Sequence, residues 1–168
     1  MKRLLSLLTG CAALALFACA PALATDLTIT AANVVPSSSA LIKEATAGAT
    51  IAAGQLVYLD TADLDARGIG KAKLTDCDSA TALIRTCAGM AINSASSGQR
   101  VNYVEFDPAL TIGGSQTANT ILIASPTAGG VAPAADLSTG EYLLVLGVVK
   151  TTTVIYFRAP GLASGVAQ

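Results

Sequence analysis

The stretch YLLVLGVVKTTTVIYFRA, which begins at Tyr142 and ends at Ala159, contains the two most apolar strand candidates of the chain. Both runs, 142–149 and 152–159, consist mainly of β-branched, aliphatic and aromatic residues, which favour strands. The short connection that starts at Lys150 is a plausible tight turn, so the stretch predicts a β-hairpin. Gly147 interrupts the first run and is expected to mark a β-bulge. We expect this hairpin to form the centre of the hydrophobic core.

The rest of the chain, read outward from the hairpin, is also a series of short strand candidates separated by Gly, Pro, Ser and Asp. About ten short strands at this spacing predict an all-β sandwich or barrel. At most one short helix is expected, from Ser79 to Arg85, with Asp78 or Ser79 as its N-cap. The other strand candidates are 27–35, 40–45, 55–60, 71–75, 88–93, 100–106, 109–112, 120–124 and 130–133.

Two segments of the chain resemble each other. AAGQLVYLD begins at Ala52 and SSGQRVNYVEFD begins at Ser96, and each has two small residues, then Gly-Gln, then Val, Tyr and an acidic end. Turn-and-strand units of this kind resemble one another by turn chemistry alone. A single pair of segments therefore does not indicate a duplication.

The N-terminus has the layout of a secretory signal. Lys2 and Arg3 precede an apolar run that extends to Phe17, and Ala22-Leu23-Ala24 follows a proline. This order predicts a signal peptide at 1–24, cleavage after Ala24 and a single β-domain at 25–168. The alternatives are an uncleaved anchor and a lipoprotein modified at Cys11 or Cys19. The expected location is the periplasm or the extracellular space.

Two cysteines, Cys77 and Cys87, remain after the signal. In an exported chain such a pair most simply forms one disulfide, which here would close a short loop. A reactive redox pair would need a group that stabilises a thiolate, whereas the neighbouring Asp76 and Asp78 raise a thiol pKa. The sequence therefore favours a structural disulfide between Cys77 and Cys87.

Low charge limits the classes of partner. Charged residues make up 12% of the chain and aromatic residues 4%, and removing Lys2 and Arg3 leaves eight basic residues against eleven acidic ones, a net charge of −3. Without a basic patch, nucleic-acid binding through phosphate neutralisation is not expected. No second apolar run is long enough to cross a bilayer, so no membrane contact is expected once the signal is removed. So few charges suggest that part of the surface is covered.

The sequence contains little catalytic chemistry. It has no histidine, which excludes histidine triads, histidine metal ligands and histidine acid–base catalysis. Asp60, Asp63 and Asp65 are weak calcium candidates, because their spacing is not that of an EF-hand and no Glu closes the loop. The alternative is a solvated connection between two strands. We expect no catalytic residues, no cofactor and no enzymatic activity.

Five segments occur in order between Leu27 and Val149: LTITAANVVPSSSA, AGATIAAGQLVYLD, GMAINSASSGQRV, TIGG and TAGGVAPAADLSTGEYLLVLGVV. Together they resemble the capsid decoration (cement) proteins of tailed bacteriophages, over most of the chain that follows the signal. The resemblance implies a non-enzymatic β-domain on the outside of a shell, with a capsid protein lattice or further copies of itself as partners. The virion surface is then an alternative location.

Two features depart from that family. Phage head proteins assemble in the cytoplasm, where an export signal has no use and a disulfide does not persist. The alternative is therefore an exported bacterial protein of the envelope or extracellular matrix that binds a surface or self-associates.

Overall fold

The computed structural model describes residues 25–114 and 116–161, which form nine strands and two single-turn 3₁₀ helices. The predicted all-β fold is confirmed. The 3₁₀ helices are η1 (Ala31–Asn33) and η2 (Ala134–Asp136). The strands are β1 (Leu41–Thr46), β2 (Leu56–Leu64), β3 (Gly70–Leu74), β4 (Gly89–Ala91), β5 (Arg100–Thr111), β6 (Ile121–Ala124), β7 (Val131–Pro133), β8 (Val145–Val149) and β9 (Val154–Arg158).

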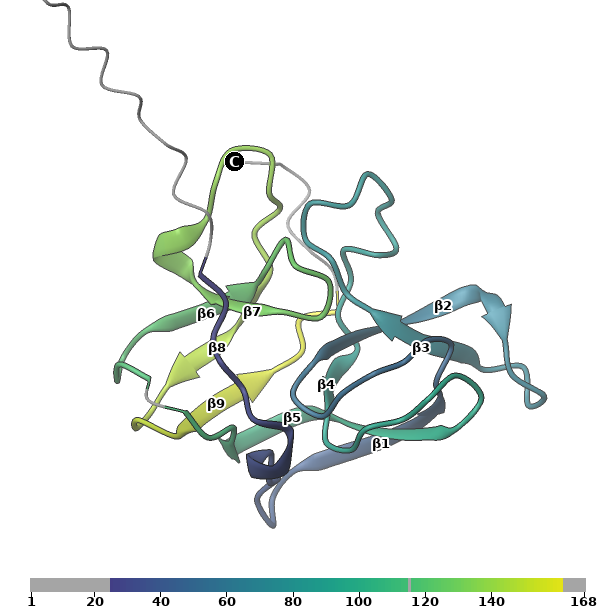
Figure 1. Cartoon of the computed structure of the whole chain (residues 1–168), viewed down its shortest axis with the longest axis horizontal. Coiled ribbons are helices and arrows are strands. Elements are labelled where there is room, and N and C mark those ends of the chain that lie inside the picture. Colours follow the sequence, from purple (N-terminus) through teal and green to yellow (C-terminus); the bar gives the residue numbers. More distant parts are fainter. Residues whose placement is uncertain (1–24, 115, 162–168) are drawn as a thin grey trace, which may run out of the picture.

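All nine strands belong to one antiparallel sheet. Its order is β3-β2-β4-β5-β9-β8-β6-β7, and β1 pairs with β5 beside that path. In Figure 1, β1 to β4 lie on the right and β6 to β9 on the left, with β5 between them. An isolated bridge between Ala47 and Ala72 joins the end of β1 to β3. This bridge closes β1, β5, β4, β2 and β3 into a small ring.

The interior of the ring is filled by small side chains. Its buried cluster contains five alanines, together with Ile51, Val57, Val101 and Tyr103. A ring of five strands is narrow, and the side chains that point inward must fill it without clashing. The high alanine content of the sequence therefore matches the space available. The five alanines are Ala45, Ala47, Ala72, Ala91 and Ala95.

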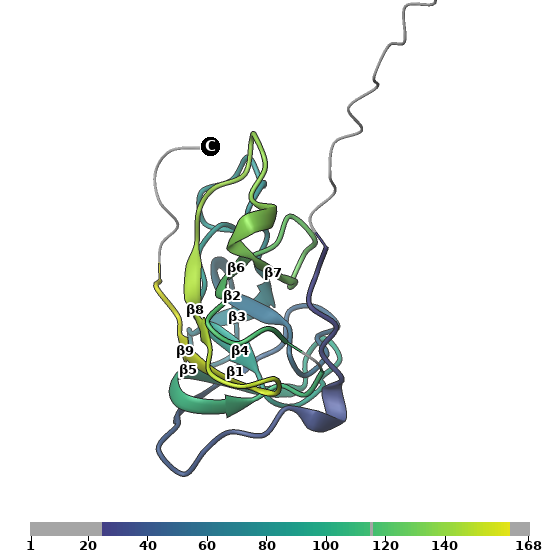
Figure 2. The same cartoon turned by 90° about the vertical axis from the view of Figure 1, so that its left-hand side faces the viewer.

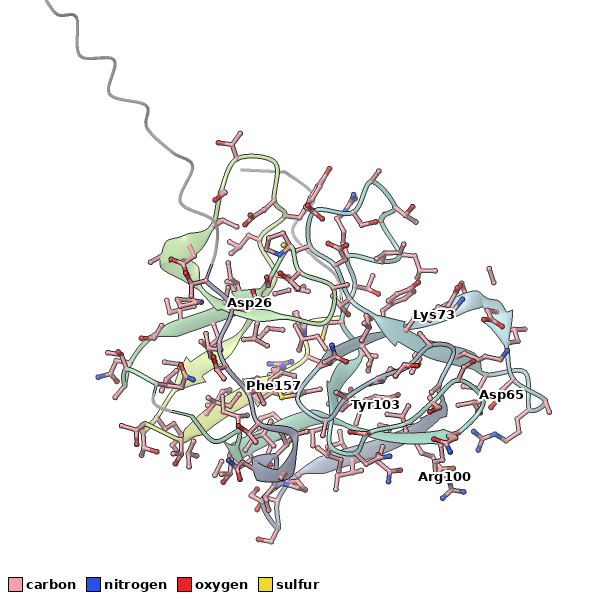
Figure 3. All side chains as sticks on the ribbon, viewed as in Figure 1. Asp26, Asp65, Lys73, Arg100, Tyr103 and Phe157 are labelled. Carbon is pink, nitrogen blue, oxygen red and sulfur yellow. The ribbon has the colours of Figure 1, made fainter. Side chains whose placement is uncertain are left out.

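A second and larger core lies between the ring and the strands β6 to β9. Neighbouring residues on the shared strands alternate between the two cores: Tyr103 of β5 belongs to the ring core and Val104 to the larger core. The same alternation occurs at Leu56 and Val57 of β2. Side chains of successive strand residues point to opposite faces, so each of these strands packs against one core on one face and against the other core on its opposite face. Figure 3 labels Tyr103 and Phe157, one from each core.

The predicted hairpin is confirmed. β8 and β9 pair antiparallel, and Ile155 and Phe157 are at most 1% exposed in the larger core. The predicted bulge at Gly147 is present, because the register between β6 and β8 shifts there. Gly147 has φ +150°, and a Cβ at this position would lie 1.9 Å from the carbonyl oxygen of Tyr156. Only glycine fits at this position.

The two similar segments form the same turn. In each, the first residue donates its N–H to the side-chain oxygen of the glutamine, at 2.8 Å for Gln55 and 2.7 Å for Gln99. The glycine before each glutamine has a positive φ, +91° and +86°. The residues that precede the two turns, Ile51 and Ala95, donate N–H groups to each other's carbonyls at 2.9 Å. The similarity in sequence thus reflects one turn geometry used twice, on either side of a shared bridge.

Two element predictions were wrong in detail. The run 27–35 does not form a strand of the sheet. Its start lies beside β7, where the Leu27 N–H donates to the Val131 carbonyl at 2.7 Å, and the chain then forms η1. Alanine and asparagine at η1 favour strands poorly. The runs 100–106 and 109–112 are one strand, β5, whose register against β9 shifts between Asp107 and Leu110.

The expected helix from Ser79 to Arg85 is replaced by two successive turns. The N–H of Ile84 donates to the carbonyl of Thr81 at 3.1 Å, a three-residue step rather than a helical one. The Arg85 guanidinium donates to the carbonyl of Ser79 at 2.8 Å. These contacts satisfy local backbone groups without a helix.

The predicted signal peptide, residues 1–24, and its cleavage site at Ala24 lie outside the described residues. Among the residues that are described, no helix has the length and hydropathy required to cross a membrane.

The predicted disulfide is absent, because Cys77 and Cys87 are both free and buried in the larger core. The Cys87 thiol contacts the Gly89 carbonyl oxygen at 3.6 Å instead. Burial raises the pKa of the Cys87 thiol to about 12. Burial, together with the charges of Glu141, Asp78 and Asp76, likewise raises the pKa of Cys77 to about 12. The sequence-based expectation that these aspartates disfavour a thiolate is therefore confirmed.

The thiols should be inaccessible in the folded protein. We expect no reaction of native protein with a thiol reagent at pH 8, since both groups are buried and protonated. Two thiols should react after denaturation without a reductant. A denatured, unreduced sample with no reactive thiol would show that the disulfide forms after all.

Substitutions on the hairpin should separate its two faces. Ile155→Asp places an unpaired carboxylate in the larger core and should prevent folding. Val145→Asp, at a side chain that is 45% exposed, should change the free energy of unfolding by no more than about 0.5 kcal/mol. Circular dichroism during thermal unfolding measures both effects. An Ile155→Asp protein that melts like the parent would contradict the burial of β9.

Candidate interaction surface

The hairpin of β8 and β9 carries apolar side chains on both of its faces. Leu146 and Ile155 point into the larger core, each 1% exposed, whereas Val145 and Tyr156 are 45% and 38% exposed. An antiparallel sheet with one face in water normally alternates apolar residues inside and polar residues outside. The hairpin departs from this pattern, and Figure 2 shows it along one flank of the molecule, opposite the N-terminal segment.

The strand registers extend this apolar surface across the sheet. Val148 pairs with Tyr156 on one side and with Ile121 on the other. Phe106 pairs with both Leu41 and Arg158. Paired residues of antiparallel strands project from the same face. We call this surface the outer face, and it consists of Leu41, Phe106, Ile121, Val145, Val148, Tyr156 and Arg158.

Aromatic packing and an open hollow shape the outer face. The rings of Phe106 and Tyr156 meet edge to face, with centroids 5.6 Å apart and an interplanar angle of 79°. Beside them, Val145, Tyr156, Arg158 and Pro160 border an open hollow of about 410 Å³. Rigid aromatic and aliphatic groups around a hollow are features of protein contact surfaces.

Arg158 is the one charged residue of the outer face. Every other basic residue of the described chain has a polar or aromatic partner: Arg85 lies 3.7 Å from the centre of the Tyr142 ring, and Lys150 donates to the Pro108 carbonyl at 3.2 Å. Arg158 has no ion-pair partner among the described residues. The remaining basic residues are in ion pairs: Lys43, Arg67, Lys71, Lys73 and Arg100.

The calcium candidates Asp60 and Asp63 lie on β2 against two lysines of β3. Lys73 contacts Asp60 and Asp63 at 2.9 Å each, and Lys71 contacts Asp63 at 2.7 Å. These hydrogen bonds lower the pKa of both carboxyls and raise that of Lys73. The two aspartates are thus neutralised by the neighbouring strand.

The third candidate, Asp65, lies apart in the turn between β2 and β3. It accepts the N–H groups of Ile69 at 3.0 Å and Arg67 at 2.8 Å, and backbone bonding of this kind lowers its pKa to about 2. Glu44 bridges Arg67 and Arg100 at 3.1 and 3.0 Å. Figure 3 shows Asp65, Lys73 and Arg100 together on the right of the molecule. Over the described ranges, no three potential metal ligands of the His, Cys, Asp and Glu types gather.

A group of carboxylates lies at the end formed by the loops before β4 and β8. Asp76 accepts the N–H of Asp78 at 3.2 Å, and the N–H of Asp76 donates to the Ile84 carbonyl at 3.1 Å. Partial burial, followed by the side-chain hydrogen bond between the carboxyl groups of Asp76 and Asp78, raises the pKa of Asp76 to about 6, although the Asp78 N–H acts in the opposite direction. Asp76 therefore carries its charge at neutral pH at a cost to stability.

The outer face was missed by the sequence analysis, which searched for catalytic and metal-binding groups. The signal that could have identified it is the hairpin sequence itself. Val145, Val148 and Tyr156 are apolar at positions where a strand with one wet face would carry polar residues.

Asp76→Asn should stabilise the protein at neutral pH. The pKa of Asp76 is raised on folding, so the protonated carboxyl stabilises the folded state relative to the charged one. This contribution to the free energy of unfolding is complete below about pH 4 and is lost as the pH rises through about 6. The full shift would correspond to about 3 kcal/mol, and partial exposure reduces the expected gain at pH 7.5 to about 1 kcal/mol. Urea unfolding at pH 4.5 and 7.5 measures this, and a gain of equal size at both values would contradict the assignment.

Comparison of the chain with protein-family models and with curated proteins found no match. The functional assignment therefore rests on the geometry of this chain and on the resemblance in its sequence. The outer face is the feature of the described structure that supports it best.

Proposed function

We propose that this protein is a non-enzymatic structural protein that binds an ordered protein assembly through its outer face, as the resemblance to capsid decoration proteins implies. The observation that supports the proposal is the apolar exterior of the hairpin, with Val145 45%, Ile121 51% and Tyr156 38% exposed on neighbouring strands. Exposed apolar residues that form a contiguous patch mark contact sites, whereas isolated ones need no explanation.

The distribution of charge favours the same role. The ion pairs cluster on β1, β2, β3 and β5, and the outer face carries only Arg158. A face with one charge is inexpensive to desolvate and can lie against a repeating partner. Each contact can be weak, because a lattice or an oligomer engages many copies at once.

Binding to particles tests the proposal. Mature protein would be mixed with empty heads of a tailed bacteriophage stripped of their decoration protein, and bound protein measured by cosedimentation. We expect saturable binding without turnover of any substrate. Val145→Asp should weaken it at least tenfold, because it places a charge in the contact.

Leu64→Asp is the matched control. Leu64 is 51% exposed at the end of β2, outside the outer face, and the same substitution there should leave binding unchanged. Analytical ultracentrifugation of the same proteins measures self-association. A protein that stays monomeric and ignores the particles, or equal losses in both variants, would overturn the proposal.

A further inference from the structure

The first described residue, Thr25, is held in a defined place. Its backbone N–H donates to the Asp136 carboxylate of η2 at 3.1 Å. Two residues later, the Leu27 N–H donates to the Val131 carbonyl of β7 at 2.7 Å. The nitrogen of Thr25 is therefore fixed beside an acidic side chain that is far away in sequence.

The surroundings of this nitrogen are acidic. A hollow of about 410 Å³ is lined by Asp26, Asp136, Gln116 and Thr28, together with Thr25 and two apolar residues. Asp136 from η2 and Asp26 from the N-terminal segment are the titratable groups among these residues, and none of them is a cation. Figure 3 labels Asp26 on the left, away from the ion pairs of the ring.

Asp26 has an incomplete set of hydrogen bonds. Its Oδ1 is buried and has no hydrogen-bond partner among the described residues. A buried polar atom without a partner destabilises a protein by about 1–3 kcal/mol, and native structures contain few of them. As part of a peptide bond, the Thr25 nitrogen carries a single neutral N–H, which donates to Asp136.

We propose that cleavage after Ala24 makes Thr25 the N-terminus of the mature protein and that its α-ammonium group forms an ion pair with Asp136 and Asp26. This rests on the cleavage after Ala24 that the sequence predicts, not on the binding role of the outer face. A signal-type endopeptidase would add water across the Ala24–Thr25 peptide bond. The carbonyl carbon of Ala24 becomes a carboxylate, and the nitrogen of Thr25 becomes an amine that is protonated at neutral pH.

Cleavage changes the chemistry of this nitrogen. A peptide nitrogen has one neutral N–H, whereas an ammonium has three donors and a positive charge. Charge-assisted hydrogen bonds to carboxylates are shorter and stronger than neutral ones. The three donors can serve Asp136 and the unpartnered oxygen of Asp26 together. Removal of the signal thereby completes the site.

The two carboxylates should raise the pKa of the α-ammonium above its usual value of about 7.7–8.0, since they favour its charged form. A group whose pKa is raised on folding contributes stability that is complete below its unfolded pKa. That stability is lost as the pH rises through the folded pKa. The contribution should therefore be complete at pH 6.5 and absent at pH 10.

The test compares chains 25–168, which contain every described strand, with a free or an acetylated N-terminus. The α-amino pKa would be measured by NMR and the melting temperature at pH 6.5 and pH 10. We expect a pKa raised by about half a unit and a melting temperature about 2 °C higher for the free form at pH 6.5. The difference in melting temperature should vanish at pH 10.

Asp136→Asn should abolish both effects, and Asp26→Asn should reduce them. Asp78→Asn, an exposed carboxylate outside the hollow, is the matched control and should change neither. An α-amino pKa equal to that of an unfolded peptide, or equal melting of the free and acetylated forms, would overturn the inference. So would an intact mass showing that the exported chain does not begin at Thr25. These measurements do not involve the outer face, so a failure of particle binding leaves them unaffected.

Discussion

The backbone of β5 separates the two cores, and the rest of the fold depends on that position. Tyr103 faces the ring core and Val104 the larger core, while β1, β4 and β9 all pair with this strand. A shift of one residue would exchange the two sets of side chains, so each core fixes the register of the other. The narrow ring accepts alanines and the larger core accepts Phe157 and Ile155, and these volumes cannot be exchanged.

The same arrangement separates charge from apolar surface. Ion pairs join side chains of β1, β2, β3 and β5 and of the turn between β2 and β3, on the outside of the ring. At β8 and β9 the inner face is occupied by the larger core, and the outer face remains apolar with Arg158 as its one charge. The ion pairs thus lie on one half of the molecule, and the outer face keeps a single charge.

Period-two patterns and turn residues predicted most strands, the hairpin and the bulge at Gly147, because these features are local. The strand expected at 27–35 was wrong, since the partner of Leu27 is Val131, which lies far away in sequence. The helix expected from Ser79 was wrong because three-residue turns and the Arg85 side chain satisfy the same backbone groups. The disulfide between Cys77 and Cys87 was expected only because two cysteines remain after the signal. The number of cysteines does not say whether two buried thiols lie in a geometry that allows a bond. Asp107, fully buried and bonded to the N–H of Ser37 at 2.7 Å, was also beyond prediction, because its partner lies seventy positions away. The outer face could not be identified from the sequence without knowing which apolar side chains point away from the core.

The position of β9 has a kinetic consequence. Ile155 and Phe157 fill the larger core, and Cys87 forms a bridge with Gly161, so the last described residues complete the structure. β5 pairs with Leu41 far upstream and with Phe157 far downstream, and closing such long loops is slow. The larger core therefore cannot close until β9 has left the ribosome. The apolar strands β6 and β8 stay uncovered in the interval.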